Sequence, residues 1–132
     1  MTAVDTNVLV RLLTADDPKQ TAAARSVFAS GPVWVAKTVL LETGWVLRSL
    51  YGFEESAIRG AFTTLLGLRS LHVEDEASVT EALALMAHAI EFADALHLSS
   101  RPAGAAFVSF DQSFIRRAKK AGSGAVSILS PG

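Results

Sequence analysis

The sequence contains no cysteine, no long apolar run and no excess of charge of either sign. Without cysteine among its 132 residues, the chain has no disulfide framework, no thiolate zinc site and no cysteine nucleophile. Twelve basic and thirteen acidic side chains give a formal net charge of −1, which excludes binding to nucleic acid through bulk positive charge. Half of the residues are hydrophobic and 19% are charged, so we expect a folded globular protein.

The sequence also shows no pattern typical of a membrane-spanning helix or of a targeting segment. No charge-free stretch approaches the roughly 18 apolar residues that a membrane-spanning helix needs, so we expect no membrane partner. Residues 1–5 lack a basic segment followed by an apolar run, so we expect no secretory signal and a cytoplasmic protein. The length fits a single domain over residues 1–132, and the chain has no internal repeat or long linker.

Short apolar runs alternate with helical patterns along the whole chain. We expect strands at residues 3–4, 33–35, 71–73, 106–108 and 126–128. We expect helices at residues 7–13, 18–29, 39–51, 54–66, 76–90, 93–100 and 112–121. This alternation predicts a three-layer α/β fold, in which a mostly parallel central sheet is flanked by helices. In such folds the functional site lies beyond the carboxyl ends of the strands.

A few local signals mark where helices begin and end. Asp17 is expected to cap one helix, and Gln20 is expected to reach back to the same helix start. Thr38 is expected to cap the helix over residues 39–51, and Gly52 is expected to end it.

Two carboxylates stand out in the first half of the chain. Asp5 follows the first strand, where a site is expected, although an aspartate there can equally be a helix N-cap. Glu42 is the one charge in a nine-residue apolar stretch, so we expect its helix to be buried on all sides. A buried carboxylate must be paired, protonated or bound to a cation. The alternatives are that Glu42 reaches water or forms a salt bridge with Arg48 or Lys37.

Two more carboxylates stand out in the second half. Asp94 lies near a helix start among apolar residues, where the helix dipole by itself also favours a negative charge. Asp111 ends the fourth strand and precedes a helix, so it can also be an N-cap. If the strands are neighbours, all four acids meet at one edge of the sheet, where their repulsion calls for a cation. Oxygen ligands favour Mg²⁺ or Mn²⁺, which would activate water for attack on a phosphate.

Four segments along the chain form a recognisable set: VDTNVL at residues 4–9, VLLE at 39–42, FADALHL at 92–98, and SFD at 109–111 with Phe114. Together they resemble the motifs of PIN-domain ribonucleases of the VapC toxin type. The resemblance implies an endoribonuclease that depends on Mg²⁺ or Mn²⁺, with a central parallel sheet between helices. It also implies site residues: Asp5, Glu42, Asp94 and Asp111 as the catalytic, metal-binding acids, and Thr6 and Ser109 as supporting hydroxyls.

The same resemblance implies partners. Toxins of this type are usually inhibited by a VapB-type antitoxin, and they commonly form homodimers. The apolar helices over residues 39–50 and 57–66 are candidate surfaces, although either can simply be core. Two alternatives remain open: a PIN nuclease that processes RNA without an antitoxin, and a PIN-fold binding module without activity.

A basic helix follows Asp111 and is the candidate RNA-binding surface. Its cations can contact phosphates, or they can form an ordinary solvated face. Trp34 and Trp45 lie in apolar runs, so we expect them in the core and not as a platform for stacking bases. The candidate RNA-binding residues are Arg116, Arg117, Lys119 and Lys120.

Other phosphate-handling folds fit the sequence less well. A receiver domain needs adjacent acids after the first strand and a lysine after the last, and a haloacid-type phosphatase needs a second aspartate two residues after Asp5. The chain has Thr6-Asn7 there. A dinucleotide-binding fold needs a glycine-rich turn after the first strand, which is also absent.

Overall fold

The structure is a computed structural model that describes residues 1–131. It consists of two compact units, which we call unit 1 (Met1–Glu76) and unit 2 (Ala77–Gly132). Every strand pairing among the described residues is parallel, which confirms the expected α/β class with parallel strands and flanking helices. No helix in this part of the chain is long and apolar enough to cross a bilayer.

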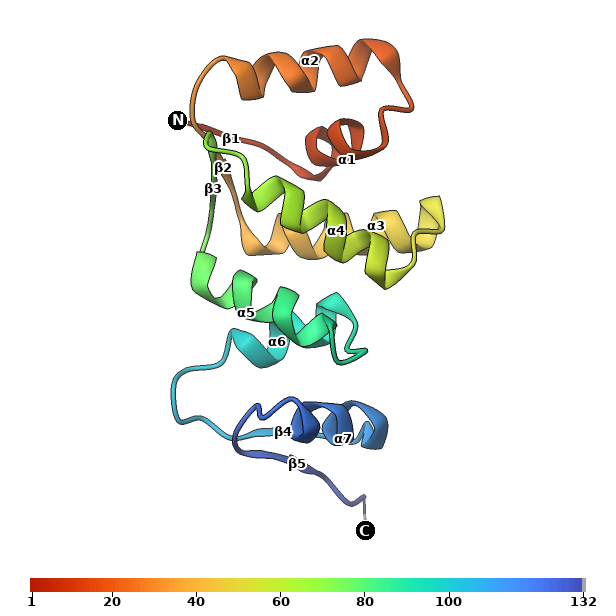
Figure 1. Cartoon of the computed structure of the whole chain (residues 1–132), viewed down its shortest axis with the longest axis vertical. Coiled ribbons are helices and arrows are strands. Elements are labelled where there is room, and N and C mark those ends of the chain that lie inside the picture. Colours follow the sequence, from red (N-terminus) through yellow and green to blue (C-terminus); the bar gives the residue numbers. More distant parts are fainter. Residues whose placement is uncertain (132) are drawn as a thin grey trace. The chain divides into compact units, whose positions relative to one another are not determined.

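Unit 1 is a three-stranded parallel sheet with four helices. The strands lie in the order β1-β2-β3, with Thr2 opposite Val33 and Val33 opposite Leu71. Helix α1 packs against both α2 and α3, and Figure 1 shows it between them. The elements are β1 (Thr2–Ala3), α1 (Thr6–Thr14), α2 (Pro18–Ala29), β2 (Val33–Val35), α3 (Lys37–Tyr51), α4 (Glu55–Leu66) and β3 (Leu71–Val73).

The ends of α2 and α3 test the local signals in the sequence. Asp17 caps α2 by accepting hydrogen bonds from the backbone N–H of Lys19 (3.1 Å) and of Gln20 (3.0 Å), as expected. Gly52 ends α3 in the left-handed conformation (φ 69°), also as expected. The prediction for the Gln20 side chain was wrong, because its Oε1 accepts a hydrogen bond from Nε of Arg11 at 2.6 Å.

The start of α3 differs from the prediction. The helix begins at Lys37, its N-cap is Ala36, and Thr38 does not cap it. A carboxylate oxygen of Glu74 instead accepts the hydrogen bond of the Lys37 backbone N–H at 2.9 Å. Glu74 lies just after β3, so a side chain distant in sequence satisfies an amide that Thr38 was expected to serve.

Helix α3 is buried along one face only. Leu40, Thr43, Gly44 and Leu47 are buried and follow the helical spacing of three to four residues. Glu42 is exposed and Trp45 is 55% exposed, so the prediction of a helix buried on all sides was wrong, and so was the prediction that Trp45 lies in the core. Trp34 on β2 is half-buried.

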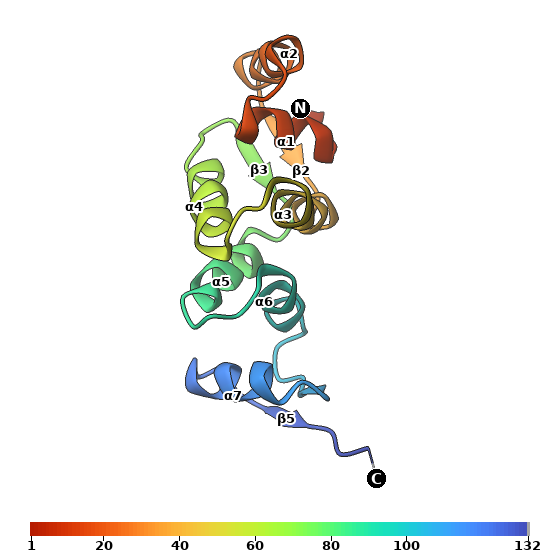
Figure 2. The ribbon, with the colours of Figure 1, turned by 90° about the vertical axis from the view of Figure 1, so that its right-hand side faces the viewer.

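Unit 2 has a two-stranded parallel sheet. Phe107 on β4 is opposite Val126 on β5, and α7 packs along this pair of strands (Figure 2). The rings of Phe107 and Phe114 meet edge to face with centroids 5.6 Å apart. The elements are α5 (Glu76–Met86), α6 (Phe92–Ser99), β4 (Phe107–Ser109), α7 (Gln112–Lys120) and β5 (Val126–Ile128).

Helix α5 ends four residues earlier than predicted. It stops at Met86, and the chain turns before α6 begins. Ala89 in this turn has a positive φ of 60°, a conformation that a residue with a Cβ adopts at some cost. The turn brings the carbonyl of Ala89 within reach of α7, and it therefore matters for the site.

Candidate active site

Asp5 lies between β1 and α1, at the carboxyl end of its strand, as predicted. It is the N-cap of α1, and its Oδ1 accepts a long hydrogen bond from the backbone N–H of Val8 at 3.4 Å. The residue is exposed. Capping uses only Oδ1, so Oδ2 keeps its lone pairs for another ligand. The two interpretations of Asp5, N-cap and site acid, are therefore compatible.

Thr6 connects Asp5 to the second acid of unit 1. The Thr6 hydroxyl donates a hydrogen bond to Oε1 of Glu42 on α3. Thr6 is buried, at 7% exposure, so α1 holds its hydroxyl in place, whereas Glu42 is exposed. The contact engages Oε1 of Glu42 and leaves Oε2 for another ligand.

Lys37 and Arg48, the cations considered as salt-bridge partners of Glu42, form salt bridges with other carboxylates. Nζ of Lys37 lies 2.9 Å from Asp75, and Nη1 of Arg48 lies 3.5 Å from Glu55. Glu42 therefore does not depend on these cations for its orientation, and the neutral hydroxyl of Thr6 performs that task.

Asp94 and Asp111 line one cavity of unit 2, with a volume of about 160 Å³. Asp94 lies in the first turn of α6 and is half-buried, and Asp111 is the N-cap of α7 and is exposed. Oδ1 of Asp111 accepts a hydrogen bond from the backbone N–H of Phe114 at 3.0 Å. The structure thus brings these two predicted acids together, and both helix-end interpretations also hold.

Ser109 supports the backbone at Asp111. Its hydroxyl oxygen accepts a hydrogen bond from the backbone N–H of Asp111 at 3.0 Å. The last residue of β4 thereby fixes the start of α7, and with it the direction in which the Asp111 carboxylate leaves the helix end.

Two further charged residues line the same cavity, and the sequence reasoning missed both in this role. Glu91 lies three residues before Asp94, a spacing that places both on one side of the helix start. Arg117 on α7 also lines the cavity, and its Nη1 donates a hydrogen bond to the carbonyl oxygen of Ala89 at 3.1 Å. Helical spacing offered a partial signal, since Arg117 lies four residues after Ser113, which also lines this cavity.

The other basic side chains of α7 line a different cavity, of about 390 Å³. Its wall includes Ile115 on the helix and Ile128 on β5. The structure therefore divides the four predicted RNA-binding cations into two groups. One is Arg117 beside the acids, and the other is Arg116, Lys119 and Lys120 together.

Asp94 and Asp111 fit a hard divalent cation as a pair. Within residues 1–131, no three His, Asp or Glu side chains form a cluster that would hold a metal ion. Mg²⁺, however, keeps several waters and is commonly held by one or two carboxylates. Asp94 and Asp111, which line one small cavity, match this requirement.

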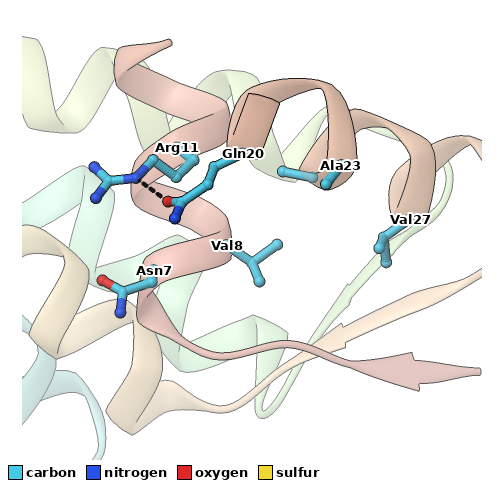
Figure 3. A pocket seen from close by; sticks show the side chains of 7 residues that line it. Asn7, Val8, Arg11, Gln20, Ala23 and Val27 are labelled. Atoms are coloured by element: carbon cyan, nitrogen blue, oxygen red, sulfur yellow. Dashed lines mark hydrogen bonds between the residues drawn. The ribbon is translucent and has the colours of Figure 1, made fainter. Parts of the chain in front are cut away.

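A third cavity lies between α1 and α2 and has a volume of about 350 Å³. Figure 3 shows its polar end, where Asn7, Arg11 and Gln20 gather, and its apolar end, formed by Ala23 and Val27. The sequence reasoning did not foresee this cavity. It contains none of the four predicted acids.

Arg11 at this cavity is held by a network that reaches α3. Its Nη1 lies 3.1 Å from Asp16 and donates a hydrogen bond to the hydroxyl of Tyr51 at 2.8 Å. The Tyr51 hydroxyl in turn donates to Asp16 at 2.7 Å. This hydrogen bond lowers the pKa of Asp16, helped by Thr14 and by the charge of Arg11, while the contact with Tyr51 raises the pKa of Arg11.

The chain is similar to known PIN domains. The model of the PIN domain family matches residues 2–120. Among solved structures, the chain is similar to the Mycobacterium tuberculosis toxin VapC20, which is described as cleaving the sarcin-ricin loop. The two share 23% sequence identity with a TM-score of 0.45, over 86% of this chain and 92% of that one. No curated protein matches the sequence.

Proposed function

The chain belongs to the PIN domain family, and from this premise we propose that it is a metal-dependent endoribonuclease that hydrolyses phosphodiester bonds in RNA. The observation that carries the proposal is the pair Asp94 and Asp111, which line one small cavity of unit 2. The family match runs through both units, and this supports one PIN domain over residues 1–132.

We propose Asp5, Glu42, Asp94 and Asp111 as the catalytic acids. All four are proposed ligands of Mg²⁺ or Mn²⁺, and the all-oxygen donor set supports these ions. When bound, such a cation stabilises negative charge on the phosphate and makes water more acidic.

Two hydroxyls orient these acids. Thr6 donates to one oxygen of Glu42, so the other oxygen is the one available to a ligand. Ser109 holds the backbone N–H of Asp111, while the Asp111 carboxylate accepts from the amide of Phe114. Preorganised carboxylates do not have to be reoriented when substrate binds, which is how supporting residues contribute to rate.

The cations of α7 contact the RNA backbone in this proposal. Arg116, Lys119 and Lys120 line a cavity with an apolar wall, and their charges suit phosphates. Arg117 supplies a further cation beside the acids. Such contacts hold RNA without reading its bases, so cleavage specificity must come from elsewhere.

We propose that in the cell the protein acts as the toxin of a type II toxin–antitoxin module. The sequence motifs that resemble VapC toxins support this role, which implies a VapB-type antitoxin and action in the cytoplasm, where the RNA substrate is. A homodimer is the proposed assembly. Trp45 and Leu50, exposed on α3 at 55% and 69%, support an apolar contact on that helix.

The test is cleavage of a mixed cellular RNA pool by the purified chain with Mg²⁺ or Mn²⁺ and with a chelator. Asp94→Asn keeps the side-chain shape and removes the charge, so it should abolish cleavage while the fold is retained. Glu81→Gln is the matched control, because Glu81 is an exposed carboxylate on α5 that lines neither of the two cavities described above for unit 2. Cleavage that survives the chelator or the Asp94→Asn change would contradict the proposal.

A further inference from the structure

Helix α7 carries two adjacent arginines that face different cavities. Arg116 lines the cavity over β5, together with two lysines. Arg117 lines the smaller cavity that contains Asp94 and Asp111, and it donates a hydrogen bond to the carbonyl of Ala89. Two residues of the same type and charge, one position apart, therefore stand in different chemical surroundings.

The hydrogen bond of Arg117 connects the two helices that carry the acids. Arg117 and Asp111 belong to one helix, so backbone hydrogen bonds fix their separation, beginning with Ile115 N–H to the Asp111 carbonyl at 3.1 Å. Ala89 leads directly into α6, whose first turn contains Asp94 and closes with Ala95 N–H to the Glu91 carbonyl at 2.8 Å. The hydrogen bond from Arg117 to Ala89 thus connects the helix that carries Asp111 to the turn that leads into the helix with Asp94.

The positive charge of Arg117 also fits its place in a cavity lined by Asp94 and Asp111. Carboxylates that share a small cavity repel one another, and a positive charge at the wall of that cavity offsets part of the repulsion. Because the guanidinium is anchored on the Ala89 carbonyl, its charge is held at the wall of the cavity. Arginine can make this contact and still present other N–H groups, since it has five donors in a fixed fork.

We propose that Arg117 is a positioning residue of the acid cavity, which holds Asp94 and Asp111 at the separation that a divalent cation requires. The proposal rests on the proposed function for the identity of the ligand. It gives Arg117 a different task from Arg116, Lys119 and Lys120, which bind the RNA backbone.

The first test measures the binding of Mn²⁺ to the metal-free protein. The electron paramagnetic resonance signal of free Mn²⁺ reports how much of the ion remains unbound, and the titration gives the Kd. Arg117→Met removes both the hydrogen bond and the charge, and it should raise the Kd about tenfold, as loss of residues that orient metal ligands commonly does. Arg117→Lys can still donate to Ala89 and should stay within about threefold of the wild type. Arg116→Met is the matched control and should leave the Kd unchanged.

The second test is amide hydrogen exchange in the same metal-free proteins. Arg117→Met should speed exchange at residues 89–94, and it should do so more than at the N-terminus of α7. In cleavage assays kcat should fall while KM for RNA stays near the wild-type value, because the RNA-binding cations are intact. If Arg117→Met does not fold, Arg117→Gln, which also removes the charge, takes its place in the comparison with Arg116→Met.

Two results would overturn the inference. One is an Mn²⁺ affinity of Arg117→Met that equals or exceeds the wild-type affinity. The guanidinium of Arg117 would then do no more than repel the metal ion. The other is unchanged exchange at residues 89–94, since the hydrogen bond would then fix nothing. If the wild type itself binds no Mn²⁺, the proposed function fails, and the exchange measurement still decides whether Arg117 holds the turn.

Discussion

The two units hold their acids in different ways. In unit 1, Glu42 is exposed and receives a hydrogen bond from the neutral hydroxyl of the buried Thr6. In unit 2, Asp94 and Asp111 share a cavity of about 160 Å³ with the cation Arg117. A single carboxylate in water needs only orientation, whereas carboxylates confined together also need a compensating charge. The contrast indicates that neutral and charged supporting residues are not interchangeable between the units.

The largest expected effect comes from Asp111, where a helix cap and a site acid are the same residue. Asp111→Asn keeps a good N-cap and removes the charge, so kcat should fall at least about a hundredfold, because metal-supplied stabilisation is worth several kcal/mol. The thermal midpoint should hardly change. Cleavage rates and thermal melts of the purified variant check both points.

Asp111→Ala sharpens the result. It should be equally inactive and should also lose about 1 kcal/mol of stability, because the Phe114 amide loses its acceptor. A fully active Asp111→Asn would instead mean that Asp111 serves only as a cap.

A smaller effect is expected at Thr6. Thr6→Val keeps the buried shape and removes the hydrogen bond to Glu42, so kcat should fall about tenfold or somewhat more. Thr6→Ser retains the hydroxyl and should recover most of the activity. Equal kcat in the valine and serine variants would show that the hydroxyl does not orient Glu42 for the reaction.

The basic cavity of α7 should affect binding and leave the chemical step unchanged. Replacing Arg116, Lys119 and Lys120 by glutamine should weaken RNA binding and reduce the slope of log Kobs against log salt by about 2, at about 0.7 for each contact with single strands. Binding is measured in an Asp94→Asn background so that the RNA stays intact. An unchanged slope would assign these residues to an ordinary solvated face.

The smallest effect is expected in the network around Arg11. The pKa of Asp16 is lowered in the folded state, so its ionised form adds stability above its ordinary pKa of about 3.9, and that stability is lost as the pH falls through the lower folded value. Asp16→Asn should therefore lower the thermal midpoint slightly at pH 7, and the difference should shrink below about pH 4. A difference that is constant with pH would mean that the carboxylate charge does not matter.

Much of the fold could be predicted from local pattern. The strands Val33–Val35, Leu71–Val73 and Val126–Ile128 have the expected bounds, and the cap at Asp17 forms as expected. The errors occur where distant residues intervene. Glu74 satisfies the amide that Thr38 was expected to serve, and Arg11 takes the side chain of Gln20.

The candidate acids could be predicted, but their supporting contacts could be predicted only in part. Thr6 and Ser109 were candidates through the family resemblance, and each contacts an acid or its backbone. Arg117 was grouped with its basic neighbours, because a run of charges in sequence does not reveal which helix face each occupies. The exposure of Trp45 was missed because an apolar run does not indicate how much of a helix its neighbours cover.

By itself the sequence determined the parallel α/β class and the helix caps at Asp5, Asp17 and Asp111, and it supplied the four candidate acids. Each of these depends on short-range periodicity, on backbone amides at helix ends, or on a motif in order along the chain. The tertiary structure decided that Thr6 meets Glu42, and that Arg117 meets the turn before Asp94. Those contacts join residues 36 and 28 positions apart, and only packing of the helices brings such groups within hydrogen-bonding distance.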